Sequence, residues 1–269
     1  MVSTLIKSLK EILYPRHCLL CREKISLDEQ NDLVCLKCLK EISPHLPPFC
    51  RKCGRGLAWP DGRGLASNKP EGDGGQPNSR SHSQSHQENT ANHICGECPN
   101  TRFYFERAWA ACHYQKNARK LIHQFKYKNK IYLSRLLSEL MIDFIQQYHL
   151  PLNHCDYLIP IPLSPAKLRE REFNQAEVLA KEIAGHLGIK LLNDNLKRVR
   201  NTPAQADLDK ESRWSNIAGA FGITNPDTIK EKTILLIDDV LTTGATASEA
   251  SRVLKNAGAS VVYVLTLAS

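Results

Sequence analysis

The apolar positions toward the C-terminal end of the chain change period along the sequence, and each period predicts a different kind of element. Residues 233–268 predict a strand, a loop, a helix and a second strand. Both strands are continuous apolar runs, which is the pattern of strands in a parallel sheet that helices cover on both faces. This segment therefore predicts the centre of an α/β domain.

Segments further upstream continue the alternation. Residues 131–150 place apolar side chains on one helical face, and residues 174–188 predict a second amphipathic helix that Gly188 is suited to end. Residues 155–163 predict a short apolar strand that runs into prolines, and residues 102–114 predict strands and a turn. We therefore expect an open, mostly parallel sheet flanked by helices. The stripe of the first helix, which we interpret as core packing, consists of Leu133, Leu136, Leu137, Leu140, Met141, Phe144 and Ile145.

The first hundred residues differ from the rest in composition. They hold all the paired cysteines and show little periodicity, so we predict a small module at residues 1–100 and a larger domain at residues 101–269. Residues 54–93 contain seven of the fourteen glycines together with many Ser, Asn, Gln and Pro residues. Such a composition buries too little apolar surface to offset the entropy of ordering it, which predicts a disordered insertion.

The N-terminal end gives no sign of a membrane protein. Residues 1–13 carry apolar side chains at helical spacing, but lysines interrupt them, unlike the unbroken core of a signal peptide. No run in the chain reaches the roughly 18 apolar residues of a transmembrane helix. We therefore expect a cytoplasmic protein without a membrane span.

Eight of the ten cysteines occur in Cys-x-x-Cys pairs, which in a reducing compartment predict metal ligation rather than disulfides. Two such pairs complete the tetrahedral shell of a structural Zn²⁺ ion. Redox chemistry is the alternative, but four pairs exceed what an oxidoreductase uses. Taken in sequence order, the pairs form one site from Cys18, Cys21, Cys35 and Cys38 and a second from Cys50, Cys53, Cys95 and Cys98. The spacing leaves an interleaved pairing open as well.

The charge balance favours a phosphate-bearing or nucleic-acid partner, because 36 Lys and Arg residues face 28 Asp and Glu residues, a net charge of +8. Residues 117–130 predict a basic helix. Either this run is a solvated helix face or it contacts nucleic acid or phosphate, in which case Phe125 and Tyr127 are placed to stack on bases. Core packing is an equal alternative for Phe125. The basic side chains of the run are Lys116, Arg119, Lys120, Lys126, Lys128 and Lys130.

The most informative segment joins the first predicted strand of residues 233–268 to the helix that follows it. Asp238 and Asp239 end the strand, at the edge of an α/β sheet where ligands bind. The loop after them has small residues whose N–H groups, together with the helix N-terminus, predict an anion cradle. A simple helix cap is the alternative, and two aspartates followed by this loop fit it poorly. The loop consists of Thr242, Thr243, Gly244, Ala245 and Thr246.

This segment resembles the motif by which type I phosphoribosyltransferases bind 5-phosphoribosyl 1-pyrophosphate (PRPP). The wider sequence closely resembles the ComF family, whose members join a cysteine-rich zinc module to such a domain. Besides the paired cysteines, the matching stretches are IPIPLSPAKLREREFNQAEVLA, LKRVRNTPAQADLDKESRWSNIAGAF and ILLIDDVLTTGATASEASRVLKNAGA. Two features depart from the family: Glu172 stands where it usually has glycine, and the insertion after Cys53 is unusually long.

The resemblance implies roles for particular residues. Asp238 and Asp239 are expected to bind the ribose hydroxyls, and residues 242–246 the 5-phosphate. Pro160, Ile161 and Pro162 are expected in the pyrophosphate loop. A mobile loop over the pyrophosphate is expected to contain Lys167, Arg169 and Arg171, although a solvated charged loop is the competing interpretation. Site or partner contacts are also expected from Arg198, Arg200, Gln205 and Arg213.

Two functions from different classes follow. In the first, the protein is a phosphoribosyltransferase that displaces pyrophosphate from C1 of PRPP with Mg²⁺, and its acceptor is open. In the second, the fold binds single-stranded DNA or a nucleotide without turnover, because the ComF family is associated with DNA uptake and natural transformation. The partners expected are thus PRPP or a related ligand, single-stranded DNA and DNA-uptake proteins.

Overall fold

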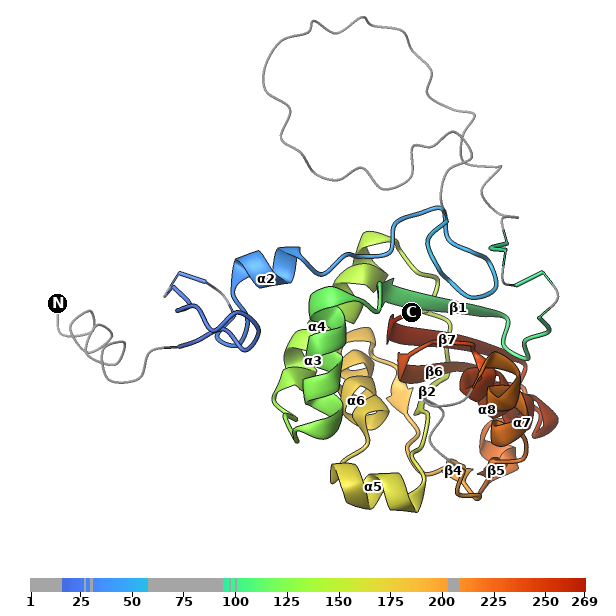
Figure 1. Ribbon diagram of the computed structural model, residues 1–269. Helices are drawn as coiled ribbons and strands as arrows, with labels where there is room; N and C mark the ends of the chain where they lie inside the picture. Colours follow the sequence, from blue (N-terminus) through green and yellow to red (C-terminus); the bar gives the residue numbers. More distant parts are fainter. Residues whose placement is uncertain are drawn as a thin grey trace, which may run out of the picture.

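A five-stranded parallel sheet forms the centre of the molecule (Figure 1). The computed structural model describes residues 16–26, 28–29, 31–57, 94–96, 98–99, 101–202 and 209–269. The helically spaced apolar residues of segment 1–13, most of the predicted insertion (residues 58–93) and Gln205 lie outside the described residues.

The sheet has the strand order β1-β7-β6-β2-β3, and every neighbouring pair is parallel. The predicted α/β class with a mostly parallel sheet is therefore confirmed. The C-terminal strands β6 and β7 are the longest and lie at its centre, as their continuous apolar runs predict. The strand bounds are β1 (Arg107–Cys112), β2 (Tyr157–Pro160), β3 (Lys190–Leu191), β6 (Thr233–Val240) and β7 (Val261–Ala268).

Helices cover both faces of the sheet (Figure 1). On one face lie α3 (Lys116–Tyr127), α4 (Leu133–Gln147) and α6 (Gln175–Leu187). On the other lie α7 (Lys210–Ile217) and α8 (Ala245–Asn256). Because side chains alternate along a strand, β6 serves both layers: Leu235 and Ile237 pack toward α4 and α6, and Ile234 and Leu236 pack toward α8.

The helices α4 and α6 lie within the ranges predicted for them. The apolar stripe of α4 is buried except at the partly buried Leu140. Helix α6 begins at Asn174, whose side chain accepts a hydrogen bond from the N–H of Ala176, and ends at Gly188 with φ 67°. A residue with positive φ at this place is the usual helix stop, so the predicted end of the helix is confirmed.

The basic segment 165–171, expected as a mobile or solvated loop, is instead a helix, α5 (Pro165–Arg171). Ser164 caps its N-terminus by accepting a hydrogen bond from the N–H of Lys167, and a proline at the first turn fits the helix without losing a bond. Glu172 ends α5 with φ 66°. Glycine adopts that conformation at no steric cost, which explains why a glycine is expected there.

A small antiparallel pair lies beside the sheet. It consists of β4 (Leu196–Arg198) and β5 (Phe221–Ile223), and a short 3-10 helix, η3 (Pro226–Thr228), follows. The strand β5 contacts α8, so the pair and α7 extend the layer on that face of the sheet. This addition carries Arg198 toward the carboxyl edge of the sheet, where the cavity described below lies.

The N-terminal part of the chain, which includes α2 (Leu36–Lys40), covers the free edge of β1. The N–H of His45 donates to Ala111 (3.0 Å), and the N–H of Ala108 donates to Lys52 (3.0 Å). Gly54, with φ 73°, lies so close to this strand that a Cβ atom would come within 2.3 Å of the Ala108 carbonyl oxygen. The parts predicted to divide near residue 100 therefore share one packed interior.

The start of the predicted insertion needs correction. Residues 54–57 are ordered together with residues 48–53. The N–H of Cys50 donates to the Arg55 carbonyl (2.8 Å), and the N–H of Leu57 donates to the Pro48 carbonyl (2.8 Å). The glycines of this short stretch serve a tight turn rather than a flexible tract. Among the helices of the described residues, none has both the length and the apolar character of a membrane span.

Candidate functional site

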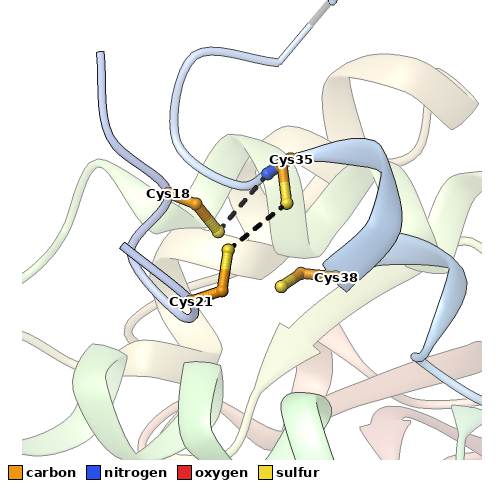
Figure 2. Close-up of side chains that lie close together, drawn as sticks. All are labelled: Cys18, Cys21, Cys35 and Cys38. Carbon is orange, nitrogen blue, oxygen red and sulfur yellow. Dashed lines mark hydrogen bonds between the residues drawn. The ribbon is translucent and has the colours of Figure 1, made fainter. Parts of the chain in front are cut away.

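The thiols of Cys18, Cys21, Cys35 and Cys38 converge on one point (Figure 2), and their four sulfur atoms lie within 4.8 Å of one another. The backbone N–H groups of Leu20 and Cys35 donate to the Cys18 sulfur at 3.4 and 3.5 Å. Such bonds stabilise a thiolate, the form of cysteine that binds metal. The first group is thus the one expected from sequence order.

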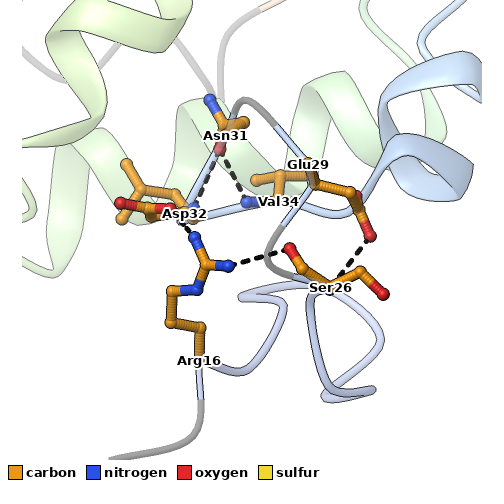
Figure 3. A network of polar contacts seen from close by, with 7 residues as sticks. Arg16, Ser26, Glu29, Asn31, Asp32 and Val34 are labelled. Carbon is orange, nitrogen blue, oxygen red and sulfur yellow. Dashed lines mark hydrogen bonds and ion pairs between the residues drawn. The ribbon is translucent and has the colours of Figure 1, made fainter. Parts of the chain in front are cut away.

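Side chains around the first cysteine cluster fix the loop between its two Cys-x-x-Cys turns (Figure 3). Arg16 pairs with Asp32 and donates to the Ser26 carbonyl at 2.8 Å. Asn31 accepts hydrogen bonds from two backbone N–H groups, including that of Val34 at 2.9 Å. The cluster is therefore positioned by polar contacts on one side and by buried apolar residues on the other.

The second cluster brings together Cys50, Cys53, Cys95 and Cys98, again within 4.8 Å. The N–H of Cys95 donates to the Cys50 sulfur at 3.3 Å. Three of the four, all except Cys95, are buried among the residues that pack against α8 and the inner strands. The Lys52 ammonium group donates to the carbonyls of Cys98 and Thr101, each at 3.1 Å, which ties the two halves of this ribbon together.

Both clusters fit a zinc ion. Four adjacent thiols cannot all ionise unless a cation compensates them. Accordingly, a hydrogen bond from Cys53 lowers the pKa of Cys50 to about 4, whereas burial and the neighbouring thiols raise the pKa of Cys98 to about 12. Four cysteine sulfurs without an open position form a structural rather than a catalytic zinc site. The N-terminal cysteine clusters therefore form zinc ribbons.

The paired aspartates stand where β6 reaches the carboxyl edge of the sheet. Asp239 is buried, and its carboxylate forms an ion pair with the Lys126 ammonium group of α3 at 2.8 Å. Asp238 accepts a hydrogen bond from the N–H of Asp239 at 2.8 Å. Desolvation and the neighbouring Asp239 raise the pKa of Asp238 to about 7, against the opposing charges of Lys126 and Arg198. The pair therefore shares its site with cations from two other segments.

A cavity of about 480 Å³ opens beside the aspartates, a size typical of small-molecule sites. Of the predicted residues, eight line it: Ile161, Pro162, Lys167, Arg171, Asp238, Asp239, Thr242 and Thr246. Five do not. Pro160 and Ala245 are buried beneath it, Arg169 points to solvent, and Thr243 and Gly244 line a smaller neighbouring space of about 20 Å³.

Basic side chains surround the cavity. Burial and the nearby Arg198 and Arg171 lower the pKa of Lys167. Arg171 donates a hydrogen bond to the Tyr127 hydroxyl at 3.2 Å and stacks over its ring at 4.9 Å, so α5 is held against the end of α3. The cations that line the cavity are Arg119, Lys126, Lys167, Arg171, Arg198 and Arg213; the carboxylates are Glu170, Asp238 and Asp239.

Several donors at this cavity have no partner in the described part of the chain. They are buried nitrogen atoms: Nε of Arg171, Nε of Arg198 and Nε2 of Gln175. A buried polar group without a partner costs about 1–3 kcal/mol. These groups therefore favour a bound ligand that accepts hydrogen bonds.

The loop after β6 has the geometry of an anion cradle. Within the described residues, the backbone N–H groups of Thr242, Thr243 and Gly244 donate no hydrogen bond. Gly244 has φ 80°, and a Cβ atom there would come within 2.7 Å of the Phe103 ring. Glycine was expected here for close approach of a ligand; the structure adds that Phe103 occupies the space on one side of it.

Sequence reasoning placed some residues of the cavity in another context. The sequence pattern groups three of them with the basic run, but in the structure they line the cavity: Arg119, Lys126 and Tyr127. Asn174 and Gln175 were expected only as the start of a helix. Asn174 donates to the Ile161 carbonyl at 3.1 Å and so fixes the loop after β2. Of the weaker candidates, Arg198 and Arg213 line the cavity and Arg200 does not.

A separate groove of about 550 Å³ runs along α3 and is lined by Lys116, Arg119 and Lys120 of this helix. Leu19 and Leu20, which lie between Cys18 and Cys21 of the first cluster, form one wall of it. None of the described residues that line this groove is acidic. The side chains from α3 and its end are Lys116, Arg119, Lys120, His123, Gln124 and Lys128, and Arg119 also lines the cavity at the aspartates.

Two protein families match separate parts of this chain. Residues 9–68 match the double zinc ribbon domain, and residues 174–269 match the phosphoribosyl transferase domain. The first match contains three of the Cys-x-x-Cys pairs, and the second contains the paired aspartates with the loop after them. The two matches therefore correspond to the two kinds of site described above.

Named relatives extend the similarity. Competence protein F of Haemophilus influenzae is 27% identical over 256 residues, which cover 93% of this chain and 96% of that protein. DNA utilization protein YhgH of Salmonella typhi is 28% identical, with 63% of this chain and 75% of that protein covered. Competence protein ComFC of Streptococcus pneumoniae is 29% identical, with 57% of this chain and 64% of that protein covered. The chain thus resembles proteins named for competence and for DNA utilization.

Proposed function

Since this chain is a ComF family protein with a double zinc ribbon and a phosphoribosyltransferase domain, we propose that it binds PRPP or a related ribose 5-phosphate ligand. Asp238 and Asp239 accept hydrogen bonds from the ribose hydroxyls. The N–H groups and hydroxyls of residues 242–246 hold the 5-phosphate. In this proposal, residues 101–269 supply the cavity and residues 1–100 the zinc module.

The observation that carries the proposal is an acidic pair in a cavity whose charged lining is mostly basic. Six cations and three carboxylates line it, so its charge is positive before a ligand enters. A ligand that combines vicinal hydroxyls with several phosphate groups matches both features. The unpartnered donors of Arg171, Gln175 and Arg198 support an acceptor-rich ligand at the same place.

The pyrophosphate is assigned to the wall formed by the loop after β2 and by α5. Ile161 and Pro162 line that wall, and Lys167 and Arg171 bring positive charge to it. Asp238 offers carboxylate oxygens of the kind that Mg²⁺ prefers, and a bound Mg²⁺ ion would supply charge neutralisation for the pyrophosphate. Arg169 points to solvent in the described conformation, so its assignment to the ligand requires α5 to rearrange.

If the protein turns PRPP over, the bond from C1 of the ribose to the pyrophosphate oxygen breaks, and C1 forms a bond to the acceptor. The carbon develops positive charge as pyrophosphate leaves with the bonding electrons. The carboxylates of Asp238 and Asp239 would favour that charge, and the cations of α5 would favour the leaving group.

Calorimetric titration of the zinc-loaded protein with PRPP, with and without Mg²⁺, tests the proposal. We expect micromolar binding that the Asp238→Asn/Asp239→Asn variant weakens by roughly 100-fold, because two hydrogen bonds change from a charged carboxylate to a neutral amide acceptor, a loss of about 1.4 kcal/mol each. Equal binding by the wild type and the variant would refute the assignment of the aspartates. Absence of binding by the wild type would refute the proposed ligand.

A second candidate function is binding of single-stranded DNA. The basic groove between the Cys18–Cys21 turn and α3 supports it. Relatives named for competence and DNA utilization make DNA the ligand to test. The groove and the cavity share Arg119, so a strand in the groove would reach toward the cavity. Partners in DNA uptake belong to this same hypothesis.

Neutralising Lys116, Lys120 and Lys128 together tests the second candidate without altering residues that line the cavity. Each phosphate contact to a single strand contributes about 0.7 to the slope of log K against log salt concentration. We therefore expect the triple glutamine variant to bind an oligonucleotide more weakly, with a slope reduced by about 2. The matched control neutralises Lys181, Lys190 and Lys230, which are exposed elsewhere. Equal effects of the two variants would mean that the groove is not the site.

A further inference from the structure

The Arg55 side chain, beside the second cysteine cluster, reaches the loop that follows β6. The Arg55 guanidinium donates a hydrogen bond to the Thr242 carbonyl oxygen at 2.8 Å. Arg55 comes two residues after Cys53, whereas Thr242 opens the loop proposed to hold the 5-phosphate. Arg55, Thr242, Thr243 and Gly244 line the same small space of about 20 Å³, on the other side of the loop from Asp238.

This bond fixes the orientation of a whole peptide group. The Thr242 carbonyl and the Thr243 N–H belong to one planar, trans peptide unit, so the two bonds point in opposite directions. While Arg55 holds the carbonyl oxygen, the Thr243 N–H must point away from Arg55. A rotation of this peptide would exchange the donor for a carbonyl oxygen, which repels an anion.

We propose that Arg55 is a positioning residue for the 5-phosphate. It acts through the Thr242–Thr243 peptide, which it holds with the N–H directed to the ligand side of the loop. The inference rests on the proposed function, because it assumes that residues 242–246 bind a phosphate. It makes the second zinc ribbon a part of the ligand site rather than a separate module.

Arg55 is itself held rigidly. Its carbonyl accepts a hydrogen bond from the N–H of Cys50 at 2.8 Å, and the N–H of Gly54 donates to the Cys50 carbonyl at 2.9 Å. Gly54 packs on the Ala108 carbonyl of β1 in a conformation with φ 73°. The cysteine turn therefore presents Arg55 from a base fixed on the sheet itself.

The opposite end of the same ribbon supports the loop from a second direction. The chain that leaves Cys98 brings the Phe103 ring against Gly244, and the N–H of Tyr104 donates to the Ser248 hydroxyl of α8 at 3.2 Å. Both strands of the ribbon thus contact the segment from Thr242 to Ser248. The loop is held between them in the conformation that leaves its N–H groups available.

The test separates the two phosphate positions of the ligand. The wild type and the Arg55→Ala variant are titrated calorimetrically with ribose 5-phosphate and, separately, with pyrophosphate and Mg²⁺. We expect Arg55→Ala to bind ribose 5-phosphate about 10-fold more weakly, the effect of one lost hydrogen bond near a charge, and pyrophosphate as the wild type does. Arg55→Lys, which keeps a donor, should recover part of the loss.

Arg51→Ala is the matched control, because Arg51 is exposed on the same cysteine turn. Its affinity for both ligands should equal that of the wild type, and zinc content and melting temperature should be the same in all variants. Equal weakening of both ligands by Arg55→Ala, or no weakening at all, would overturn the inference alone. Failure of the wild type to bind ribose 5-phosphate would overturn the proposed function and this inference with it.

Discussion

Replacing Cys53 with serine is expected to lower the free energy of unfolding by more than about 4 kcal/mol, the range of mutations that remove a structural metal. Cys53 is buried, and its cluster packs in the same interior as Ala108, Ile234 and Leu254. Loss of this metal site would leave three thiols inside that interior and release the turn that carries Gly54. Chemical unfolding followed by circular dichroism measures the change, and a zinc assay should fall from two ions per chain to one.

Cys21→Ser is the matched comparison, because Cys21 is the exposed member of the first cluster. It should also reduce the zinc content, but with a smaller loss of stability, since Cys21 is exposed whereas Cys53 is buried. A Cys53→Ser protein that unfolds at the same denaturant concentration as the wild type would show that the second cluster contributes little to folding. Equal losses in the two variants would show that burial of the second cluster adds nothing to its contribution to stability.

Replacing Lys126 with methionine is expected to weaken the proposed PRPP binding at pH 7 by roughly 10- to 100-fold, equivalent to about 1.4–2.8 kcal/mol. Lys126 pairs with Asp239 in a nearly buried contact, the two side chains being 17% and 9% exposed. Burial opposes its charge, but the attraction of Asp239 and Asp238 is larger and raises the pKa of Lys126. The variant leaves two adjacent carboxylates without their nearest cation and removes one positive charge from the cavity.

The pH dependence distinguishes this role from a purely structural one. Lys126 and Arg198 lower the pKa of Asp238, while desolvation and Asp239 raise it to about 7. Without Lys126 that pKa rises further, so Asp238 is mostly protonated at pH 7 and ionises only at higher pH. Part of the lost affinity should therefore return at pH 8.5. Lys181→Met, on the exposed face of α6, is the control; a loss in Lys126→Met that is the same at every pH would contradict the argument.

The central elements of the fold follow from local pattern. The strands β6 and β7 are continuous apolar runs, and α4 carries its stripe on one face, so period and burial agree along each segment. The loop at residues 242–246 is also local, because a strand and a helix that are adjacent in sequence place it at the edge of the sheet. For these parts the sequence contains the necessary information in a short window.

The rest of the site depends on contacts between distant segments. No pattern within α3 indicates that Lys126 faces Asp239 while Lys120 faces a different groove. Arg55 lies in a glycine-rich stretch whose composition predicts disorder, yet its carbonyl accepts a hydrogen bond from Cys50, in a turn that Lys52 joins to β1. The helix α5 has a local signal, since Ser164 before a proline is a typical helix start, but the resemblance to the family's mobile loop predicts a loop at this place.

The position of β7 has a consequence for how the protein is made. This strand lies between β1 and β6, and Arg107 pairs with Tyr263. At about 5–20 residues per second, the ribosome needs on the order of 10 seconds to reach β7 after completing β1. During that interval the apolar strand β1 has its N-terminal cover on one side and an open edge on the other. The sheet is completed when β7 inserts between β1 and β6, not when a strand is added at an outer edge. We therefore expect a nascent chain to depend on chaperones until synthesis reaches β7.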